Sequence, residues 1–374
     1  MAKSISLGTA VAQPGTIQYG QWDAITHPTG HDDYLPVMIA QGRKAGPCIW
    51  LTAGIHGPEH TGPTVLYRLI TQELVDQLRG TIVALPALSP AGLRTKEYVP
   101  YHLPKNPNRM WPDGKPARPQ DPDEEAPSSV ERAFARLFVH IRQTADFMID
   151  YHNAWIDSIS FVFRDRVLYH AKGENEAQNR AKAEALAHQQ EAMMAAYGHT
   201  IVTEFPAKHY IKQDLHRSTS GAALLVAGIP AFTVELGTGL MPDQAMVAAS
   251  VAGTRNVLRW AGMLPGDMEP IVGIKMADPG FRTRRSEGTR VEEACVALHL
   301  VESGDMVKKG DPLAELRDVW GRPLANSPLR SPHDGFVIAR EHGIYFYPGD
   351  TIVHLSIHDE DPVTAPYPDA YYRE

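Results

Sequence analysis

The chain has 374 residues, enough for two or three domains, and its 43% hydrophobic and 21% charged residues are ordinary values for a folded globular protein. Its 36 basic and 44 acidic residues give a net charge of −8, which repels phosphate backbones and anionic lipids, so we expect no nucleic-acid and no membrane partner. Two cysteines, Cys48 and Cys295, cannot form a disulfide framework, and no signal peptide or long apolar run is apparent, so we expect a cytoplasmic protein.

From Pro36 onward, short β-rich apolar runs alternate with longer helical patterns, which is typical of an α/β domain with a mostly parallel sheet. The predicted strands lie at residues 37–40, 48–53, 81–88, 147–151, 201–205 and 231–235. The predicted helices lie at residues 62–78, 128–144, 175–197, 219–227 and 242–260. We therefore expect an α/β domain over residues 1–264, in which residues 1–35 form an N-terminal extension or edge strands.

The segment 110–127 interrupts this alternation. It contains five prolines among charged residues, so it cannot form a helix interior or a central strand. A long loop is predicted, and it is either a binding rim or lid, or a surface insertion.

After Pro265 the helical periodicity ends, and short β runs alternate with turns such as Ser303-Gly304-Asp305. We expect a β-rich domain over residues 265–374. Its pattern resembles the half-repeats of biotinyl and lipoyl carrier domains, but the turn near Asp318–Gly321 lacks the lysine that a carrier modifies. We interpret it as a carrier-like barrel without the modified lysine, which disfavours the alternative of a non-catalytic carrier protein.

Chemistry-bearing residues follow three of the predicted strands. His56 and Glu59 come after the strand at 48–53, His152 follows the strand at 147–151, and Glu235 ends the strand at 231–235. Ligands collect outside the carboxyl ends of strands in open parallel sheets, so we expect these four side chains to meet. Two histidines and a glutamate leave one zinc position open, as in catalytic zinc sites. Glu235 would then accept a proton from the metal-activated water and pass it to the leaving nitrogen.

The segment His56–His60 also spells H-x-x-E-H, the signature in which both histidines bind the metal from one helical face and Glu59 is the base. Gly57 and Pro58 directly follow a strand and disfavour such a helix. We therefore favour Glu59 as a ligand and Glu235 as the base.

Three motifs resemble those of the succinylglutamate desuccinylase and aspartoacylase family of zinc carboxypeptidase-like deacylases. Residues 54–59, Gly-Ile-His-Gly-Pro-Glu, are similar to the family's G-x-H-G-x-E, and residues 235–237 are similar to its E-L-G. Residues 106–112, Asn-Pro-Asn-Arg-Met-Trp-Pro, are similar to its D-L-N-R-x-F-P, with the leading Asp-Leu replaced. The resemblance covers residues 36–262 and continues weakly beyond them.

The resemblance implies a zinc carboxypeptidase-like fold and one Zn2+ ion per chain, bound by His56, Glu59 and His152. It also implies that Glu235 is the general acid/base. Asn108 and Arg109 would contact a substrate carboxylate or carbonyl, and Arg94 would lie near the scissile carbonyl. A guanidinium binds a carboxylate bidentately, which agrees with this role for Arg109.

The predicted activity is hydrolysis of the amide bond of a small N-acyl amino acid or N-acyl diamine that bears a carboxylate. The alternative is a metallocarboxypeptidase that acts on short peptides. A homo-oligomer is compatible with the sequence, which identifies neither the acyl group nor the amine.

Overall fold

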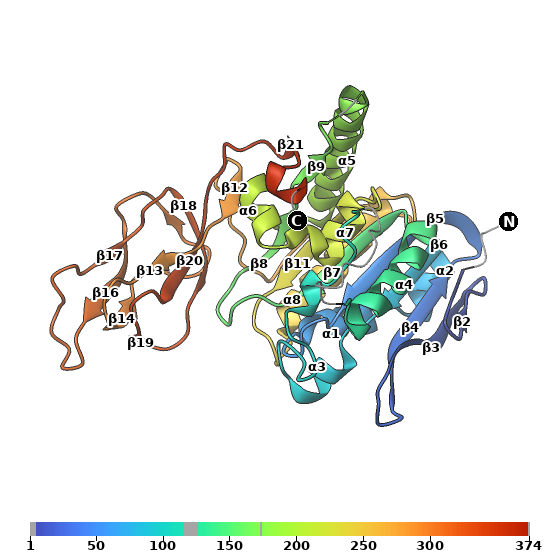
Figure 1. The fold of residues 1–374 in the computed structure, drawn as a ribbon, viewed down its shortest axis with the longest axis horizontal. Helices are drawn as coiled ribbons and strands as arrows, with labels where there is room; N and C mark the ends of the chain where they lie inside the picture. The colour runs from blue at the N-terminus through green and yellow to red at the C-terminus, as the bar shows by residue number, and fades with distance from the viewer. Residues whose placement is uncertain (1–4, 116–125, 173, 373–374) are drawn as a thin grey trace.

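The computed structural model describes residues 5–115, 126–172 and 174–372. A large mixed sheet with helices on both faces forms one part of the molecule, and a lobe of short strands extends from it, at the left of Figure 1. The expected α/β fold is therefore present, followed by the expected β-rich segment.

The large sheet has a parallel centre with antiparallel additions. Its strands in this part are β3 (Thr16–Thr26), β4 (Asp32–Gln41), β5 (Lys44–Ala53), β6 (Arg79–Leu85), β7 (Phe147–His152), β8 (Ser160–Arg164), β10 (Thr200–Thr203) and β11 (Ala231–Leu236). Strands β11, β7, β5 and β6 are parallel neighbours, and β10 is parallel to β8. Antiparallel pairing joins β8 to β11 and adds β4 and β3 beyond β6. Strand β3 shows that residues before Pro36 include an edge strand of this sheet.

Eight α-helices lie in the described part of the chain. They are α1 (Thr61–Leu69), α2 (Gln72–Gln77), α3 (Pro90–Thr95), α4 (Ser129–Thr144), α5 (Glu176–Tyr197), α6 (Ala207–Lys212), α7 (Thr219–Leu225) and α8 (Gln244–Trp260). The predicted helix 62–78 is two helices, because the Thr71 side chain accepts a hydrogen bond from the Leu74 amide and starts α2. Helix α4 starts where Ser128 and Glu131 form a capping box.

The central strands β5, β7 and β11 are buried on both faces, as their near-continuous apolar sequences predict. Alternate residues of β5 enter different cores: Trp50 packs on the side of α4 and α7, whereas Ile49 and Leu51 pack on the side of α1, α2 and α8. This burial fixes the register of β5 and therefore the position of the loop that follows it.

Two layers of short strands form the C-terminal lobe, one a separate four-stranded sheet and the other the end of the large sheet. Strands β14 (Cys295–His299), β16 (Pro312–Arg317), β17 (Leu329–Arg330) and β19 (Tyr345–Phe346) make one. Strands β13 (Thr289–Arg290), β15 (Met306–Val307), β18 (Gly335–Arg340) and β20 (Thr351–His358) make the other. Apolar side chains from both sheets, including Leu313, Phe346 and Val353, share one core.

The C-terminal segment also returns to the large sheet. Strand β12 (Thr283–Arg285) pairs in parallel with β10 and antiparallel with β20, so the large sheet and one sheet of the lobe are continuous. Strand β21 (Thr364–Pro366) pairs with β9 (Val167–Tyr169). The C-terminal segment is thus joined to the α/β part by parallel strand pairing at two places, β12 with β10 and β21 with β9.

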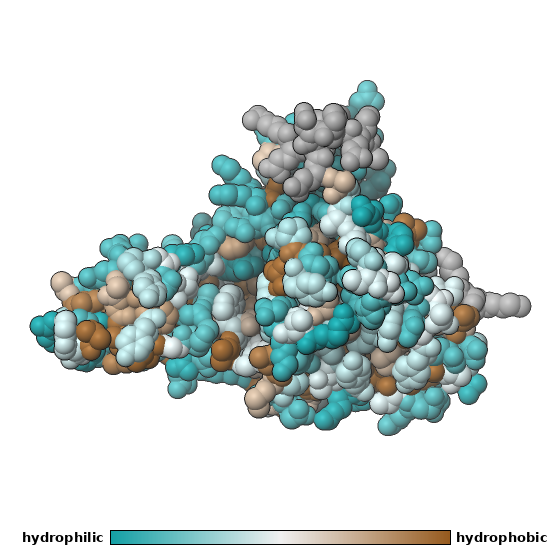
Figure 2. All heavy atoms as spheres, turned by 60° about the horizontal axis from the view of Figure 1, so that its bottom comes forward, coloured by the Kyte–Doolittle hydropathy of each residue, from teal (hydrophilic) through white to brown (hydrophobic). Residues whose placement is uncertain are grey.

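The face in Figure 2 is largely hydrophilic, with apolar residues in small separate groups. None of the described helices has the length and apolar character needed to cross a membrane. Cys48 and Cys295 are both buried and form no disulfide. In the predicted loop 110–127, residues 110–115 and 126–127 contain neither helix nor strand, and residues 116–125 lie outside the described residues.

Candidate active site

Three neighbouring parallel strands end at one place on the sheet. Ala53, the last residue of β5, pairs with Tyr151 of β7, and His152 of β7 pairs with Glu235 of β11. The register alone therefore places His152 and Glu235 side by side. The loop that leaves β5 adds His56 and Glu59, as the strand-end pattern predicts.

The loop 54–60 is shaped by two glycines. Gly54 has a φ of +67°, a conformation that side chains other than glycine rarely adopt. At Gly57 a Cβ atom would lie 2.1 Å from the carbonyl oxygen of Gly92, so only glycine allows the loop to approach that backbone.

Helix α1 begins only at Thr61, so His56 and His60 do not share a helical face. The ring nitrogens of His60 lie 3.0 and 3.2 Å from the backbone oxygens of Gly57 and Leu240. The helical H-x-x-E-H alternative is therefore wrong.

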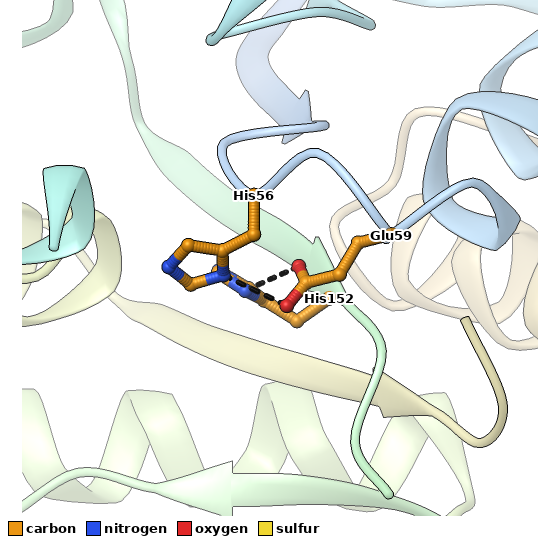
Figure 3. Close-up of side chains that lie close together, drawn as sticks. All are labelled: His56, Glu59 and His152. Carbon is orange, nitrogen blue, oxygen red and sulfur yellow. Dashed lines mark hydrogen bonds and ion pairs between the residues drawn. The ribbon is translucent and has the colours of Figure 1, made fainter. Parts of the chain in front are cut away.

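His56, Glu59 and His152 form a compact, buried cluster (Figure 3). The His56 Nδ1 atom lies 2.7 Å from Glu59 Oε1, and the His152 Nδ1 atom lies 2.9 Å from Glu59 Oε2. One ligand atom from each residue lies within 4.8 Å of the others. Two imidazole nitrogens and a carboxylate oxygen are a donor set that zinc uses in catalytic sites, so these residues fit a divalent metal.

The other nitrogen of each histidine is held by a second oxygen. His152 Nε2 lies 2.8 Å from Asp150 Oδ2, and His56 Nε2 lies 2.8 Å from Asn106 Oδ1. Asp150 in turn accepts a hydrogen bond of 2.6 Å from the Thr52 hydroxyl. Partners of this kind fix the ring orientation and the tautomer of a metal-binding histidine, and here they leave both Nδ1 atoms facing Glu59.

The cluster is strongly coupled electrostatically. Burial alone would raise the pKa of Glu59, but the adjacent His56 and His152 outweigh it and hold that pKa well below its usual value. Burial alone would lower the pKa of His152, but Glu59 and Asp150 outweigh it and raise that pKa. A carboxyl group that is more easily ionised next to an imidazole that is more easily protonated marks a position where positive charge is favoured.

Glu235 is next to this cluster and has a different environment. Its Oε2 atom is buried and has no hydrogen-bond partner among the described residues. Burial raises the pKa of Glu235 to about 7, and the charge of Glu59 acts in the same direction against that of His152. A carboxyl group that titrates near neutral pH can both accept and donate a proton under ordinary conditions.

Asn108 and Arg109 also line the site. The Asn108 Oδ1 atom accepts hydrogen bonds from the amide and hydroxyl of Thr219, and its Nδ2 atom lies 3.4 Å from His152 Nε2. The Arg109 Nε and Nη1 atoms donate to the backbone oxygens of Gln213 and Asn108. Both side chains are thus fixed by the protein before any substrate binds.

Arg94 is not brought to this cluster. It lies on α3, its side chain is 55% exposed, and its Nη2 atom donates to Asp33 at 2.8 Å. It does not line the cavity that contains the other predicted residues. The predicted position of Arg94 near a scissile carbonyl therefore has no support in the geometry.

The cluster opens into a cavity of about 390 Å³, the size of small-ligand sites. Its lining also includes Tyr98, Trp155, Asp165, Glu204 and Arg285. The Tyr98 ring stacks on His56 at 3.9 Å between centroids, and Trp155 stacks at the same distance on His354 of β20. Arg285 comes from β12, so the C-terminal segment forms part of the cavity wall.

Comparison with known proteins agrees with the resemblance in the motifs. Residues 45–261 match the family model of the succinylglutamate desuccinylase/aspartoacylase catalytic domain. A curated relative, the N-alpha-acetyl-L-2,4-diaminobutyric acid deacetylase of Halomonas elongata, is 27% identical over 332 residues, which are 86% of this chain and 85% of the relative.

Two solved structures share the fold over almost the whole chain. A succinylglutamate desuccinylase/aspartoacylase from Rhodobacter sphaeroides has a TM-score of 0.67 at 18% identity, covering 92% of this chain and 96% of its own. The product-bound ectoine utilization protein of Ruegeria pomeroyi has a TM-score of 0.65 at 20% identity, covering 91% and 94%. The strand-end motifs, the matched catalytic domain and the shared fold agree: this chain belongs to the succinylglutamate desuccinylase/aspartoacylase family.

Proposed function

We propose that this protein is a zinc-dependent hydrolase that cleaves the amide bond of a small N-acyl amino acid. The observation that carries this proposal is the grouping of His56, Glu59 and His152 within 4.8 Å, in one cavity with Glu235. This combination supplies a metal-binding donor set and a proton-transfer group at the same place. The named activity of the Halomonas elongata relative, a deacetylase, supports the same reaction class.

In this proposal His56, Glu59 and His152 hold the metal. When bound, a Zn2+ ion supplies Lewis acidity, which polarises an amide carbonyl and makes water a stronger nucleophile near neutral pH. Asp150 and Asn106 keep the two histidines in the orientation that this requires. Burial of the cluster excludes bulk water, which strengthens each electrostatic interaction there.

Glu235 has the role of proton carrier. Its carboxylate accepts a proton from the attacking water and delivers it to the nitrogen that leaves as the free amine. A pKa of about 7, caused by burial, suits both halves of this transfer. The position of Glu235 beside His152 in the strand register supports this assignment.

Asn108 and Arg109 are proposed to bind the substrate. Arg109 uses two nitrogens to hold its own position, which leaves Nη2 to donate to a substrate carboxylate. Asn108 directs its amide nitrogen toward the histidine cluster. Arg94 has no part in the proposal, because it pairs with Asp33 outside the cavity.

The first experiment measures amine release from N-acetyl, N-succinyl and N-formyl amino acids and from short peptides, with zinc-loaded protein and the Glu235→Gln variant. We expect hydrolysis of acyl amino acids, and a loss of about 10²- to 10⁴-fold in kcat for Glu235→Gln, the usual contribution of a general acid/base. The variant should bind zinc as the wild type does, because Glu235 is not a ligand in this proposal. Failure of the wild type to hydrolyse any acyl amino acid would contradict the proposed function.

The metallocarboxypeptidase alternative is tested in the same assay. Trp155 and Arg285 line the cavity and limit its size. Its volume of about 390 Å³ is small for a peptide. Cleavage of peptides without hydrolysis of acyl amino acids would favour that alternative.

A further inference from the structure

Asn106 lies between two parts of the candidate active site. Its Oδ1 atom is 2.8 Å from His56 Nε2, the ring nitrogen that points away from Glu59 in Figure 3. The same oxygen accepts a 2.8 Å hydrogen bond from the backbone amide of Asn108. One side-chain atom thus contacts both a candidate metal ligand and a residue of the pair proposed to bind substrate.

These contacts determine which nitrogen of His56 carries a proton when the ring binds a metal. A backbone amide can only donate, so the Asn106 atom next to the Asn108 amide is the carbonyl oxygen and not the side-chain nitrogen. A carbonyl oxygen can only accept, so His56 Nε2 carries the hydrogen that it shares with Asn106. A metal-binding imidazole is neutral, so the lone pair is then on the Nδ1 atom of His56, which faces Glu59.

Asn106 also holds the turn that presents Asn108 and Arg109. Residues 107–109 form a single turn of 3-10 helix, and Asn106 is its N-cap. Besides the bond from its side chain to the Asn108 amide, its backbone oxygen accepts a 3.1 Å hydrogen bond from the Arg109 amide. A side-chain oxygen at an N-cap stabilises the turn by accepting from an amide that has no partner within it. The conformation of this part of the cavity lining therefore depends on Asn106.

The second histidine of the candidate metal site has a different partner. His152 is bound by Asp150, a charged residue of the same strand, β7. Asn106 is neutral and comes from a loop, between α3 and the turn at 107–109. An aspartate stands at this position in the family motif D-L-N-R, so this chain keeps the acceptor oxygen but lacks the charge. The hydrogen bond from His56 to Asn106 is thus the one that links the metal site to the loop that carries Asn108.

We infer that Asn106 is a positioning residue that couples the metal site to the substrate-binding turn. A metal held by His56 fixes the ring, the ring fixes the Asn106 oxygen, and that oxygen fixes the Asn108 amide. Coupling of this kind is reciprocal, so an ordered turn favours metal binding as much as the metal favours an ordered turn. This inference rests on the proposed function, because it takes His56 to be a metal ligand.

Two variants test the contact with the metal site, through competition for zinc with a fluorescent chelator. Asn106→Asp keeps the acceptor oxygen and adds a charge that makes His56 a stronger ligand, so we expect zinc affinity to rise by about 10-fold. Asn106→Ala removes the acceptor, and we expect zinc affinity to fall by about 10- to 100-fold. A gain of affinity cannot result from misfolding. If Asn106 only capped the turn, zinc affinity would stay within about twofold in both variants, which would overturn the inference.

Hydrogen–deuterium exchange tests the contact with the turn without measuring activity. We expect zinc to slow exchange of the Asn108 and Arg109 amides by at least about fivefold in the wild type and in Asn106→Asp. Asn106→Ala should not show this effect of zinc, because the link between ring and turn is missing. Exchange in the wild-type turn that does not respond to zinc would overturn the coupling.

Kinetics at saturating zinc separate the two contacts. Asn106→Ala should raise KM by about fivefold, the factor that corresponds to loss of one capping hydrogen bond, whereas Asn106→Asp still caps the turn and should keep KM within about twofold. An unchanged KM for Asn106→Ala would overturn the role in the turn. Asn179→Asp is the matched control, because Asn179 also hydrogen-bonds a backbone oxygen, that of His170, but does not line the cavity.

The results distinguish this inference from the proposed function. Zinc affinity and amide exchange that depend on Asn106, in a protein that hydrolyses no acyl amino acid, would support the inference and refute the proposed activity. Hydrolysis with the same zinc affinity in the wild type and both variants would leave the proposed function intact and refute the inference. A wild-type protein that binds no zinc would refute both.

Discussion

Replacing Asp150 with asparagine tests the proposed metal site through a residue that does not itself belong to the ligand set. Asp150 is 1% exposed, and its Oδ2 atom lies 2.8 Å from His152 Nε2. Asparagine keeps the shape of the side chain but loses its negative charge. That charge orients the His152 ring and makes its other nitrogen a stronger metal ligand. Loss of such a partner weakens metal binding by about 10- to 100-fold, or roughly 1.4–2.8 kcal/mol, so we expect that decrease in zinc affinity for Asp150→Asn.

The assay is competition for zinc between the purified protein and a fluorescent chelator of known affinity. Thr52→Val removes the 2.6 Å hydrogen bond to Asp150 but keeps its charge, so its effect should be smaller than that of Asp150→Asn. Asp146→Asn is the matched control, because Asp146 accepts a hydrogen bond from the Cys48 amide just before the start of β7, at the other end of that strand. A zinc affinity of Asp150→Asn within about twofold of the wild type would refute the orienting role of this carboxylate.

Three further predictions concern single side chains. Arg109→Lys should raise KM with little change in kcat, because lysine lacks the planar fork that binds a carboxylate, and an unchanged KM would remove Arg109 from the substrate site. Arg94→Ala should leave kcat/KM within about twofold of the wild type, because the Arg94–Asp33 pair is partly exposed and outside the cavity, and a tenfold loss would restore a catalytic role. Burial lowers the pKa of His199 to about 4 from its usual 6.5, so the folded protein holds this histidine in its neutral form. The contribution of neutral His199 to the free energy of unfolding is therefore complete above pH 6.5, and it decreases by about 3 kcal/mol in all as the pH falls toward 4. Urea unfolding at pH 7 and pH 4.5 should show a smaller loss of stability for His199→Gln than for the wild type, and equal losses would contradict this cause.

The sequence was sufficient to bring His56, Glu59, His152 and Glu235 together. Each follows or ends a strand of the parallel part of the sheet, and the carboxyl ends of parallel strands meet at one edge. The roles of these residues remain predictions, but their proximity followed from chain order and strand direction alone.

Other features depend on contacts that spacing does not encode. Arg94 points toward Asp33 because of the orientation of α3, which its six residues do not specify. Asp165 was missed because β8 was not predicted, although the strand-end argument applied to that strand would have found it. Arg285 is on a three-residue strand, too short to produce a recognisable pattern.

The pairing of β12 with β10 has a consequence for the order of folding during synthesis. Thr203 of β10 is paired with Arg284 of β12, which is 81 positions later in the chain. At translation rates of about 5–20 residues per second, β10 waits roughly 4–16 seconds for this partner, with backbone groups exposed along one side. An exposed strand edge can pair with another chain, so the nascent protein is prone to aggregation through this edge during the interval. The C-terminal segment thus ends a vulnerable stage of biogenesis as well as completing the cavity wall.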